Sequence, residues 1–384
     1  MKILWVNSSF LDYRIPVYKR LNELSGGNFY IVYSRTMVPE RIPYKIEAAI
    51  GNHAIAIDGE NQLCIGKSDT LANKNLRIPR PSGLYKVIKE VNPDIIIGEG
   101  FFQWTPFALR YSITHRKPLF IGYERTKWTE RDCPKWRALY RKVVDEFTRG
   151  YLCNGILTKE YLMDELKVSE KKITTGTMSA DSEGLAKASL SISPEERAAF
   201  KHSLGLHEEG ITFLYSGYLI PRKGVDYLLQ AWMKHIQTYP KDQLLLVGGG
   251  ELQESLSKTY GREKSIYFMG TVVYDTIYRY YNAADVFVIP TLEDNWSLVV
   301  PEAMACGLPV ACSVYNGCYP ELVHEGENGA LFDPLDVKST VKALDYFHHV
   351  DLDQQGARSI EIEKQYNTER VAQNIFNALM ADFK

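Results

Sequence analysis

The stretch ADVFVIPTLEDNWSLVVPEAMACGLPV, residues 284–310, decides the fold of the C-terminal half of this chain. Its apolar run at residues 286–289 is short, β-branched and ended by Pro290, which predicts an interior parallel strand. The polar segment at residues 291–297 then forms the loop at the carboxyl end of that strand. Because α/β proteins bind their ligands at the carboxyl ends of parallel strands, this loop predicts a binding site.

A helix is expected to begin between Ser297 and Pro301 and to end near Gly307, since proline suits a first turn and glycine a C-terminal cap. The amides and the partial positive charge of a helix start favour a bound phosphate. Asp294 and Glu302 flank this start. A carboxylate repels a phosphate, so we expect these two to accept hydrogen bonds from neutral hydroxyls of a ribose or a sugar.

Residues 301–310, PEAMACGLPV, resemble the donor-binding segment of glycosyltransferase family 4, which comprises retaining enzymes of the GT-B fold. The family signature is a Glu, seven residues, and a second Glu followed by Ala-Met-Ala-x-Gly. Glu302 takes the second position here, whereas Asp294 replaces the first Glu, with Glu293 one position earlier. The resemblance implies that Glu302 binds the ribose hydroxyls and that Asp294 contacts the sugar, unless Glu293 supplies that carboxylate. The remaining donor-binding residues expected in this segment are Asn295, Trp296, Ser297, Leu298 and Val299.

A second motif, GYLIPRKG, occupies residues 217–224. A strand ends at Gly217, and a proline and a glycine then fix a turn that holds Arg222 and Lys223 at the mouth of the next helix. Two cations there would bind a diphosphate and stabilise it as a leaving group. The motif resembles the family's Gly-Arg-x-x-x-x-Lys-Gly region, with Tyr218 in the place of the Arg, so Lys223 is better supported than Arg222. The alternative is a basic surface turn.

Two glycine-containing strand ends follow. The run LVGGG at residues 246–250 lacks the GxGxxG spacing and a downstream ribose acid, which excludes a dehydrogenase loop. By the resemblance it permits close backbone approach near the donor. Residues 267–272, which include Met269 and Gly270, resemble the segment whose backbone meets the nucleotide base; ordinary core packing is the alternative.

Catalytic candidates in the N-terminal half lie in loops after predicted strands. Glu124 and Arg125 follow one strand and are candidates to bind acceptor hydroxyls or a phosphate, with a surface salt bridge as the alternative. Glu99 occupies a similar position. Arg14, at the start of the first helix, is a candidate for an acceptor anion or else a solvated residue of a helix cap.

Two further segments concern phosphate and metal binding. The first loop lacks the Gly-Gly pair that many relatives use beside the phosphates, and Asn7 and Ser8 are candidates to substitute through their side chains. The pair Asp351 and Asp353 lies beside no glycine turn. No metal site is predicted, which agrees with the metal-independent chemistry that the resemblance implies.

The order of apolar runs predicts an α/β protein with a doubly wound parallel sheet in each half. With the resemblance, this becomes the GT-B architecture of two Rossmann-like domains facing across a cleft. The expected domains are residues 1–190 on the acceptor side and residues 191–367 on the donor side, with a helix capped by Thr368 returning to the first domain through residues 368–384. The predicted strands are 3–6, 29–32, 95–97, 119–121, 151–157, 212–217, 244–247, 266–269 and 286–289. The predicted helices are 13–24, 83–91, 105–114, 137–148, 224–239, 251–260 and 274–284.

Composition indicates a soluble globular protein, since 45% of the residues are hydrophobic and 24% charged, with no apolar run as long as a membrane span. The six cysteines form no CxxC pair, which favours reduced thiols in a cytoplasmic protein. Residues 1–190 contain 29 Lys and Arg against 21 Asp and Glu, and the remainder contains 16 against 26. The pI near 6.5 and the absence of a nucleic-acid-binding motif exclude nucleic acid as a partner.

The sequence therefore predicts a retaining glycosyltransferase that moves a sugar from a nucleotide diphosphate sugar to a carbohydrate or lipid-linked acceptor, without a cofactor. The catalytic candidates are Lys223, Arg222, Asp294 and Glu124. The alternatives are a nucleotide-sugar epimerase or hydrolase of the same fold, or a non-catalytic nucleotide-sugar-binding subunit. The basic and aromatic run at residues 125–149 predicts peripheral contact with the anionic inner leaflet through Arg137 and Arg141, with a solvated basic helix face as the alternative.

Overall fold

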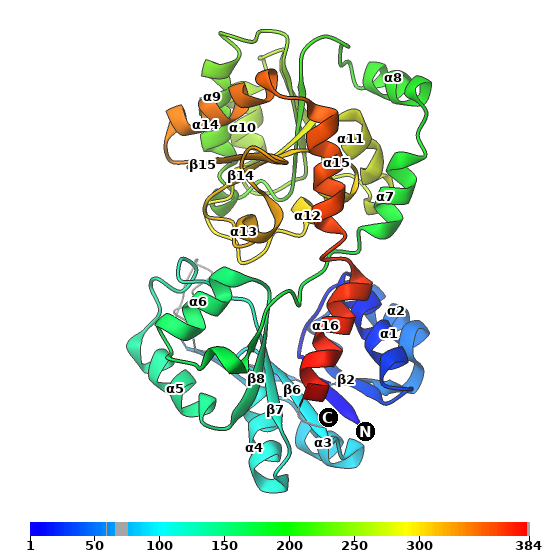
Figure 1. The fold of residues 1–384 in the computed structure, drawn as a ribbon, viewed down its shortest axis with the longest axis vertical. Coiled ribbons are helices and arrows are strands. Elements are labelled where there is room, and N and C mark those ends of the chain that lie inside the picture. The colour runs from blue at the N-terminus through cyan, green and yellow to red at the C-terminus, as the bar shows by residue number, and fades with distance from the viewer. Residues whose placement is uncertain (59, 66–75, 382–384) are drawn as a thin grey trace. The chain divides into compact units, whose positions relative to one another are not determined.

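The computed structural model describes residues 1–58, 60–65 and 76–381 (Figure 1). The chain forms two compact units. Unit 1 comprises Met1–Asp181 and Tyr366–Lys384, and unit 2 comprises Ser182–Gln365. The first crossing between the units therefore falls after Asp181 rather than after residue 190, because the helix at Glu183–Leu190 packs with helices of unit 2.

Unit 1 contains a seven-stranded sheet whose neighbouring strands all pair in parallel. The strands are β1 (Ile3–Val6), β2 (Phe29–Ser34), β3 (Ala54–Ile57), β6 (Ile95–Glu99), β7 (Leu119–Tyr123), β8 (Thr148–Cys153) and β9 (Ile173–Thr174). Their order across the sheet is β3-β2-β1-β6-β7-β8-β9. The strand order reverses beside β1, as in a doubly wound sheet.

Helices cover both faces of this sheet, and each strand alternates between two cores. Ile3 and Trp5 of β1 pack in one core with the first, second and last helices of the chain, whereas Leu4 and Val6 pack in the other. The helices of unit 1 are α1 (Arg14–Leu24), α2 (Arg41–Ile50), α3 (Leu84–Val91), α4 (Thr105–His115), α5 (Lys135–Asp145), α6 (Ile156–Asp164) and α16 (Thr368–Met380), with the short 3-10 helices η1 (Gly51–His53) and η2 (Glu170–Lys172).

The last helix, α16, returns to unit 1 and packs beside α1 (Figure 1). Four of its apolar side chains are buried in the core that contains Ile3 and Trp5. The side chain of Asn367 caps the helix by accepting a hydrogen bond from the amide of Arg370 at 3.0 Å, so the predicted cap at Thr368 is wrong by one residue. Thr368 is the first residue of the helix instead.

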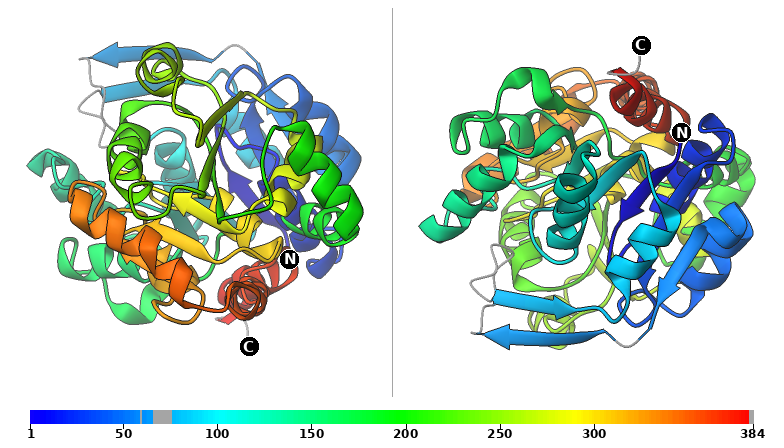
Figure 2. Two further views of the ribbon diagram at one scale, coloured as in Figure 1. Left: turned by 90° about the horizontal axis from the view of Figure 1, so that it is seen from above. Right: turned by 90° about the horizontal axis from the view of Figure 1, so that it is seen from below.

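Some elements of unit 1 differ from the sequence predictions. The strand expected at residues 151–157 begins earlier, at Thr148, because that β-branched residue is buried and pairs with Leu119, and α6 already begins at Ile156. The antiparallel pair of β4 (Asn61–Ile65) and β5 (Leu76–Arg80) lies outside the main sheet (Figure 2). Together with β3, β9, α2 and α6, this pair was absent from the prediction.

Unit 2 contains a six-stranded parallel sheet, which confirms the predicted second doubly wound sheet. Its strands are β10 (Thr212–Ser216), β11 (Gln243–Val247), β12 (Ile266–Gly270), β13 (Val286–Ile289), β14 (Val310–Ser313) and β15 (Gly329–Phe332). They lie in the order β12-β11-β10-β13-β14-β15. The β-branched run that opened the sequence analysis is thus the fully buried fourth strand of this sheet.

The helices of unit 2 are α7 (Glu183–Leu190), α8 (Pro194–Ser203), α9 (Val225–His235), α10 (Gln253–Tyr260), α11 (Ile277–Ala283), α12 (Val299–Ala305), α13 (Tyr319–Leu322), α14 (Val337–Tyr346) and α15 (Leu352–Glu363). Three 3-10 helices, η3 (Pro221–Lys223), η4 (Tyr274–Thr276) and η5 (Phe347–His349), connect them. The predicted helix before Gly307 is α12, and Gly307 ends it with a φ of 86°. Asp351 caps α15 by accepting a hydrogen bond from the amide of Gln354 at 2.9 Å.

Within the described residues, no helix is both long and apolar enough to cross a membrane. Five cysteines are free thiols: Cys133, Cys153, Cys306, Cys312 and Cys318. The side chain of the sixth, Cys64, lies outside the part of the chain whose side chains are described.

Candidate functional site

Both motifs of the C-terminal half lie at the carboxyl ends of parallel strands of unit 2, which meet at one edge of the sheet. The loops after β10 and β11 touch there through their backbones. A Cβ at Gly248 would lie 1.9 Å from the carbonyl oxygen of Gly217, and a Cβ at Gly250 would lie 2.4 Å from that of Leu219. The glycine run is therefore required for contact between two loops of the protein itself.

The turn that presents the two cations is fixed by Gly224. This residue has a φ of 65°, and a Cβ on it would lie 2.1 Å from the carbonyl oxygen of Pro290. The amide of Leu292 donates to the carbonyl of Arg222 at 2.8 Å. Backbone contacts, independent of the charged side chains, thus join the η3 turn to the loop after β13.

The side chains of Lys223 and Asp294 form an ion pair that joins the two sequence motifs. Both are largely buried, with 12% and 14% of their side-chain surface exposed. Arg222 is more exposed, at 37%; its guanidinium lies 4.0 Å from the same carboxylate and donates to the carbonyl of Glu293 at 3.3 Å. The structure brings together three of the four predicted catalytic candidates.

The carboxylate of Asp294 also organises its own loop. Ser297 donates its hydroxyl to Oδ2 at 2.8 Å, and the amide of Trp296 donates to Oδ1 at 3.2 Å. Burial by itself would raise the pKa of Asp294, but the charge and hydrogen bond of Lys223, with the Ser297 hydroxyl, hold that pKa below its ordinary value. Asp294 is therefore an ionised carboxylate in the folded protein at neutral pH.

Several predicted donor-binding residues lie in a loop with internal hydrogen bonds. The amide of Ser297 donates to Oδ1 of Asn316 at 3.3 Å, and Gly317 approaches so closely that a Cβ on it would lie 2.0 Å from the carbonyl oxygen of Asn295. Asn295, Trp296 and Ser297 are buried, whereas Leu298 and Val299, at the start of α12, are half-buried. In this geometry the amides of Trp296 and Ser297 stabilise the loop.

Glu302 projects from α12 and accepts two tyrosine hydroxyls. Tyr281 donates to one carboxylate oxygen at 3.0 Å and Tyr274 to the other at 3.2 Å. Tyr281 is fully buried, and burial together with the Glu302 charge raises its pKa well above 10, so it remains a donor at neutral pH. Met269 and Gly270, the last residues of β12, are half-buried; Gly270 has a φ of 68°.

The N-terminal candidates form a separate cluster in unit 1. Glu99 accepts a hydrogen bond from the indole of Trp5 at 2.9 Å and lies 3.7 Å from the guanidinium of Arg14. Burial raises the pKa of Glu99 against the opposing effect of Arg14, and the charge of Glu124 raises it further. Arg14 is buried against Trp5, so the expectation of a solvated arginine is wrong. The charge of Glu124 therefore acts on the ion pair of Arg14 and Glu99.

Asn7 and Ser8 bind other side chains of unit 1. Asn7 donates to the hydroxyl of Tyr18 at 3.1 Å, and Ser8 donates to the side chain of Gln103 at 2.7 Å. Both residues are buried. They fix the loop after β1, and their proposed contact with phosphates stays a prediction.

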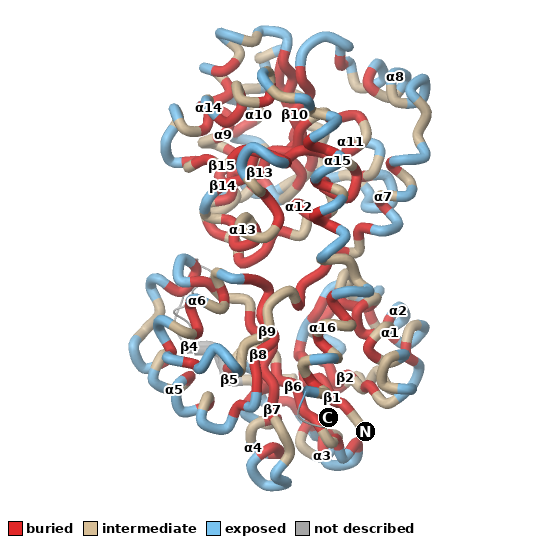
Figure 3. The backbone as a smooth tube through the Cα atoms, viewed as in Figure 1, coloured by how far each residue is buried: buried red, intermediate tan, exposed pale blue. Residues whose placement is uncertain are grey.

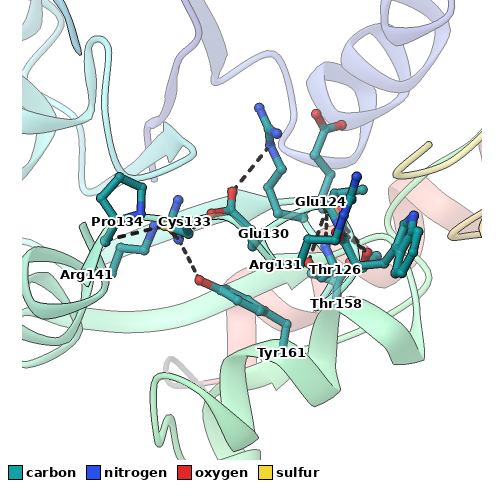
Figure 4. A network of polar contacts seen from close by, with 12 residues as sticks. Glu124, Thr126, Glu130, Arg131, Cys133, Pro134, Arg141, Thr158 and Tyr161 are labelled. Atoms are coloured by element: carbon teal, nitrogen blue, oxygen red, sulfur yellow. Dashed lines mark hydrogen bonds and ion pairs between the residues drawn. The ribbon is translucent and has the colours of Figure 1, made fainter. Parts of the chain in front are cut away.

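The basic run after β7 is folded inward around Glu130 (Figure 4). Arg141 donates to Glu130 at 2.9 Å and to the hydroxyl of Tyr161 at 2.5 Å, and Arg125 lies 3.8 Å from the same carboxylate. Arg137 and Arg141 are both buried. The prediction that these two arginines face a membrane is therefore wrong, whereas Lys135 and Lys142 of the same helix are exposed. The reason is that the buried carboxylate of Glu130 draws guanidinium groups to the inner face of α5.

Three residues that position the candidate side chains were not found from the sequence: Tyr274, Tyr281 and Asn316. Tyr281 and Glu302 are separated by 21 positions and no short motif joins them, so only the fold shows their hydrogen bond. The segment NGC at residues 316–318 has a composition typical of a turn. This composition could have indicated the loop that packs on the candidate site.

Comparisons with known proteins agree with this architecture. Residues 210–349 match the family described as glycosyl transferases group 1. The crystal structure of HepE from Anabaena in complex with UDP superposes with a TM-score of 0.77 at 16% identity, covering 99% of this chain and 100% of that one. The two parallel-sheet units therefore have the GT-B fold.

Two curated relatives match parts of the chain. An uncharacterized glycosyltransferase of Methanocaldococcus jannaschii is 31% identical over 159 residues, which is 41% of this chain and 40% of the relative. A D-inositol 3-phosphate glycosyltransferase of a Mycobacterium species is 28% identical over 244 residues, which is 61% of this chain and 53% of the relative. The chain thus matches about half, or less, of the length of these curated relatives.

Proposed function

We propose that the protein is a retaining glycosyltransferase that transfers a sugar from a nucleotide diphosphate sugar to a carbohydrate or lipid-linked acceptor. The observation that carries the proposal is the meeting of Lys223, Arg222 and Asp294 at the carboxyl edge of the unit 2 sheet, within the segment matched by the glycosyl transferase family. Glu302 lies on the helix that follows the same loop.

Glu302 supplies the ribose contact in this proposal. Each of its carboxylate oxygens holds one tyrosine hydroxyl, and a carboxylate oxygen accepts about two hydrogen bonds. A carboxylate held in this way is a suitable acceptor for the two neighbouring hydroxyls of a ribose. Tyr281 fixes the orientation of the carboxylate from the buried side.

Lys223 and Arg222 bind the diphosphate. An ammonium has three N–H donors, and Asp294 takes one of them, so Lys223 is held in place with donors left for phosphate oxygens. The half-exposed Arg222 supplies a second positive charge beside the diphosphate, whose negative charge grows as its bond to the sugar breaks. Such fixed positive charge stabilises a leaving group without rearrangement during the reaction.

The transfer itself is proposed to occur on one face of the sugar, which keeps the anomeric configuration. In this route the acceptor hydroxyl attacks from the side of the departing diphosphate, whose oxygen takes the acceptor proton. No protein nucleophile is needed, and the protein contributes position and charge. Asp294 orients the sugar, and Glu124 in unit 1 binds an acceptor hydroxyl.

The nucleotide is best identified by ligand-induced stabilisation. Crystals of HepE hold UDP and UDP-glucose, so we expect UDP to stabilise this chain more than GDP, ADP or TDP. A ligand at a hundred times its dissociation constant adds about 2.7 kcal/mol to the free energy of unfolding. Equal melting temperatures with all four nucleotides would contradict a donor site.

The reaction is distinguished from its alternatives by product analysis with UDP-sugars. Slow release of UDP in the absence of an acceptor, and transfer with the same anomeric configuration when an acceptor is added, is the expected result. An epimerised sugar nucleotide would instead indicate an epimerase. Binding without turnover toward any of a panel of carbohydrate and lipid-linked acceptors would indicate a non-catalytic subunit.

We further propose a cytoplasmic protein that contacts an anionic membrane through the apolar face of α5. Trp136, Leu139 and Val143 lie at helical spacing on that face, and Phe147 follows the helix; their exposed fractions are 49%, 64%, 53% and 48%. Figure 3 shows exposed positions along α5. The exposed Lys135 and Lys142 are seven residues apart beside this stripe and complement anionic headgroups.

A further inference from the structure

A cluster of two histidines and one aspartate lies in the helical layer of unit 2, outside the donor site. His235 is the last residue of α9, Asp242 directly precedes β11, and His348 belongs to η5. Nε2 of His235 lies 2.8 Å from Oδ2 of Asp242, and Nε2 of His348 lies 2.7 Å from the same oxygen. His235 and Asp242 are fully buried, and about a fifth of the His348 side chain is exposed.

The surroundings orient all three groups toward one point. Nδ1 of His235 lies 2.6 Å from a carboxylate oxygen of Asp345, which directs Nε2 toward Asp242. The His348 ring stacks on Tyr239, with centroids 3.6 Å apart and planes within 4°. Oδ1 of Asp242 accepts the amide of Ile211 at 2.9 Å, so Oδ2 is the atom that meets both imidazoles. A carboxylate on the outer nitrogen of a histidine is the usual partner of a metal-ligating imidazole.

The contacts of His235 hold its ring in one orientation. Both ring nitrogens face carboxylate oxygens, Nδ1 that of Asp345 and Nε2 that of Asp242. A divalent cation between the two imidazoles and Asp242 would take an Nε2 lone pair from each ring and the charge of the carboxylate.

We propose that His235, Asp242 and His348 bind one divalent cation of the zinc class. Two imidazole nitrogens and a carboxylate oxygen are donors that this class of metal accepts, and these three donor atoms lie within 4.8 Å of one another. Tetrahedral zinc would place neighbouring ligand atoms about 3.3 Å apart, so both imidazole–carboxylate distances must lengthen by roughly half an ångström. The partly exposed side of His348 gives a fourth ligand access from solvent.

The role of this site is structural. It joins the end of α9, the start of β11 and η5, which are otherwise connected through packing. Lys223 precedes the first turn of α9 and His235 ends that helix, so 11 residues, about 16 Å of helix, separate the metal from the diphosphate site. The metal therefore takes no part in glycosyl transfer, and the inference does not depend on the proposed function.

The test is a titration of the chelator-treated, full-length protein with Co²⁺ alone, followed by visible absorption spectroscopy. We expect one equivalent of Co²⁺ to give the intense visible bands of a tetrahedral site, and one equivalent of Zn²⁺ to abolish them. Zn²⁺ should also raise the melting temperature. A wild-type protein that shows no such bands and no rise in melting temperature would overturn the proposal.

Three variants locate the site. His348→Gln should weaken Co²⁺ binding at least about tenfold, and Asp345→Asn, which removes the orienting carboxylate, by roughly 10- to 100-fold. His349→Gln is the matched control, because His349 is the next residue and lies outside the cluster. Equal binding by the His348 and His349 variants would place the metal elsewhere and overturn the proposal. If His348→Gln does not fold, the half-exposed Asp345 still provides the test.

Discussion

At the scale of single residues, the ion pair between Lys223 and Asp294 has a structural role that experiments can separate from the catalytic role proposed for Lys223. Removing one partner leaves the other charge largely buried, which destabilises a protein by about 3–5 kcal/mol. We therefore expect Lys223→Met and Asp294→Asn each to lower the free energy of unfolding, and the double variant to regain much of the loss. Urea denaturation of the wild type, the two single variants and the double variant measures these free energies of unfolding.

Activity of the double variant separates the two roles. If Lys223 stabilises the leaving diphosphate, turnover stays low even where stability is restored, because the loss occurs in the transition state. Near-normal turnover of the double variant at saturating donor would show that Lys223 is only a structural partner of Asp294.

The same pair predicts a pH dependence of stability. The folded-state pKa of Asp294 lies below its ordinary value of 3.8. The stabilisation is therefore fully present above pH 3.8 and is lost as the pH falls through the lower, folded-state pKa. The difference in unfolding free energy between wild type and Asp294→Asn should be constant from pH 5 to 7 and should shrink as the pH falls below 3.8 through the folded-state pKa. A difference that grows on acidification would mean that Asp294 is not held ionised by Lys223.

Glu302 gives a second residue-scale prediction, on nucleotide affinity. Glu302→Gln should weaken binding of UDP by roughly 1.5–3 kcal/mol, the usual value for hydrogen bonds to a charged group. Tyr274→Phe removes only a half-exposed donor and should cost about 0.5–1.5 kcal/mol. Calorimetry measures the affinity of both variants for UDP. An unchanged affinity of the Glu302 variant would contradict the assignment of Glu302 to the ribose.

The candidate site was predictable to the extent that its residues lie in contiguous motifs. Both turns were expected at strand ends, and the charge types indicated their chemistry. The pairing of Lys223 with Asp294 was not predictable, because 71 positions separate the two residues and only the parallel sheet brings their loops together. For the same reason the tyrosines that hold Glu302 were missed.

At the scale of elements, most buried strands were predictable, since strands buried on both faces are continuous apolar runs. The buried strand β14 was missed, because its four residues, VACS, include a small and a polar side chain. The edge elements were harder. β3 is only partly buried for most of its length, and β9 contains two residues, so neither produces a strong pattern. The orientation of α5 was mispredicted because Arg137 and Arg141 were assigned to its outer face, whereas both are buried on the side of Glu130 in the preceding loop.

The exposed apolar face of α5 gives the element-scale prediction. Leu139→Glu combined with Val143→Glu should reduce sedimentation with anionic liposomes several-fold, because it places two charges where apolar contact is expected. The matched control is Leu190→Glu on α7, since Leu190 is equally exposed, at 62%, but lies in unit 2. Wild-type protein that does not sediment with liposomes at low salt would point to an acceptor in solution.

At the scale of the whole molecule, the chain crosses from unit 1 to unit 2 and returns, so unit 1 is completed by residues from both ends of the sequence. The units differ in what they hold in position. Unit 2 carries Lys223, Arg222 and Glu302, and unit 1 carries the ion pair of Arg14 and Glu99, on which the charge of Glu124 acts. The return segment therefore makes the stability of unit 1 depend on residues that follow unit 2 in the chain.

Truncation of that return segment is the last prediction. A chain ending at Gln365 loses α16, whose Val371, Ala372, Ile375 and Leu379 are buried in unit 1. Each fully buried Val, Ile or Leu contributes about 1.5–3 kcal/mol, so unit 1 should lose most of a typical domain stability of about 5–15 kcal/mol. Hydrogen exchange should then show faster exchange of β1 and α1 while β10 to β14 stay protected. A chain ending at Met380 removes only residues beyond the helix and should behave as wild type, whereas equal protection of β1 in both truncated chains would show that unit 1 folds without its C-terminal helix.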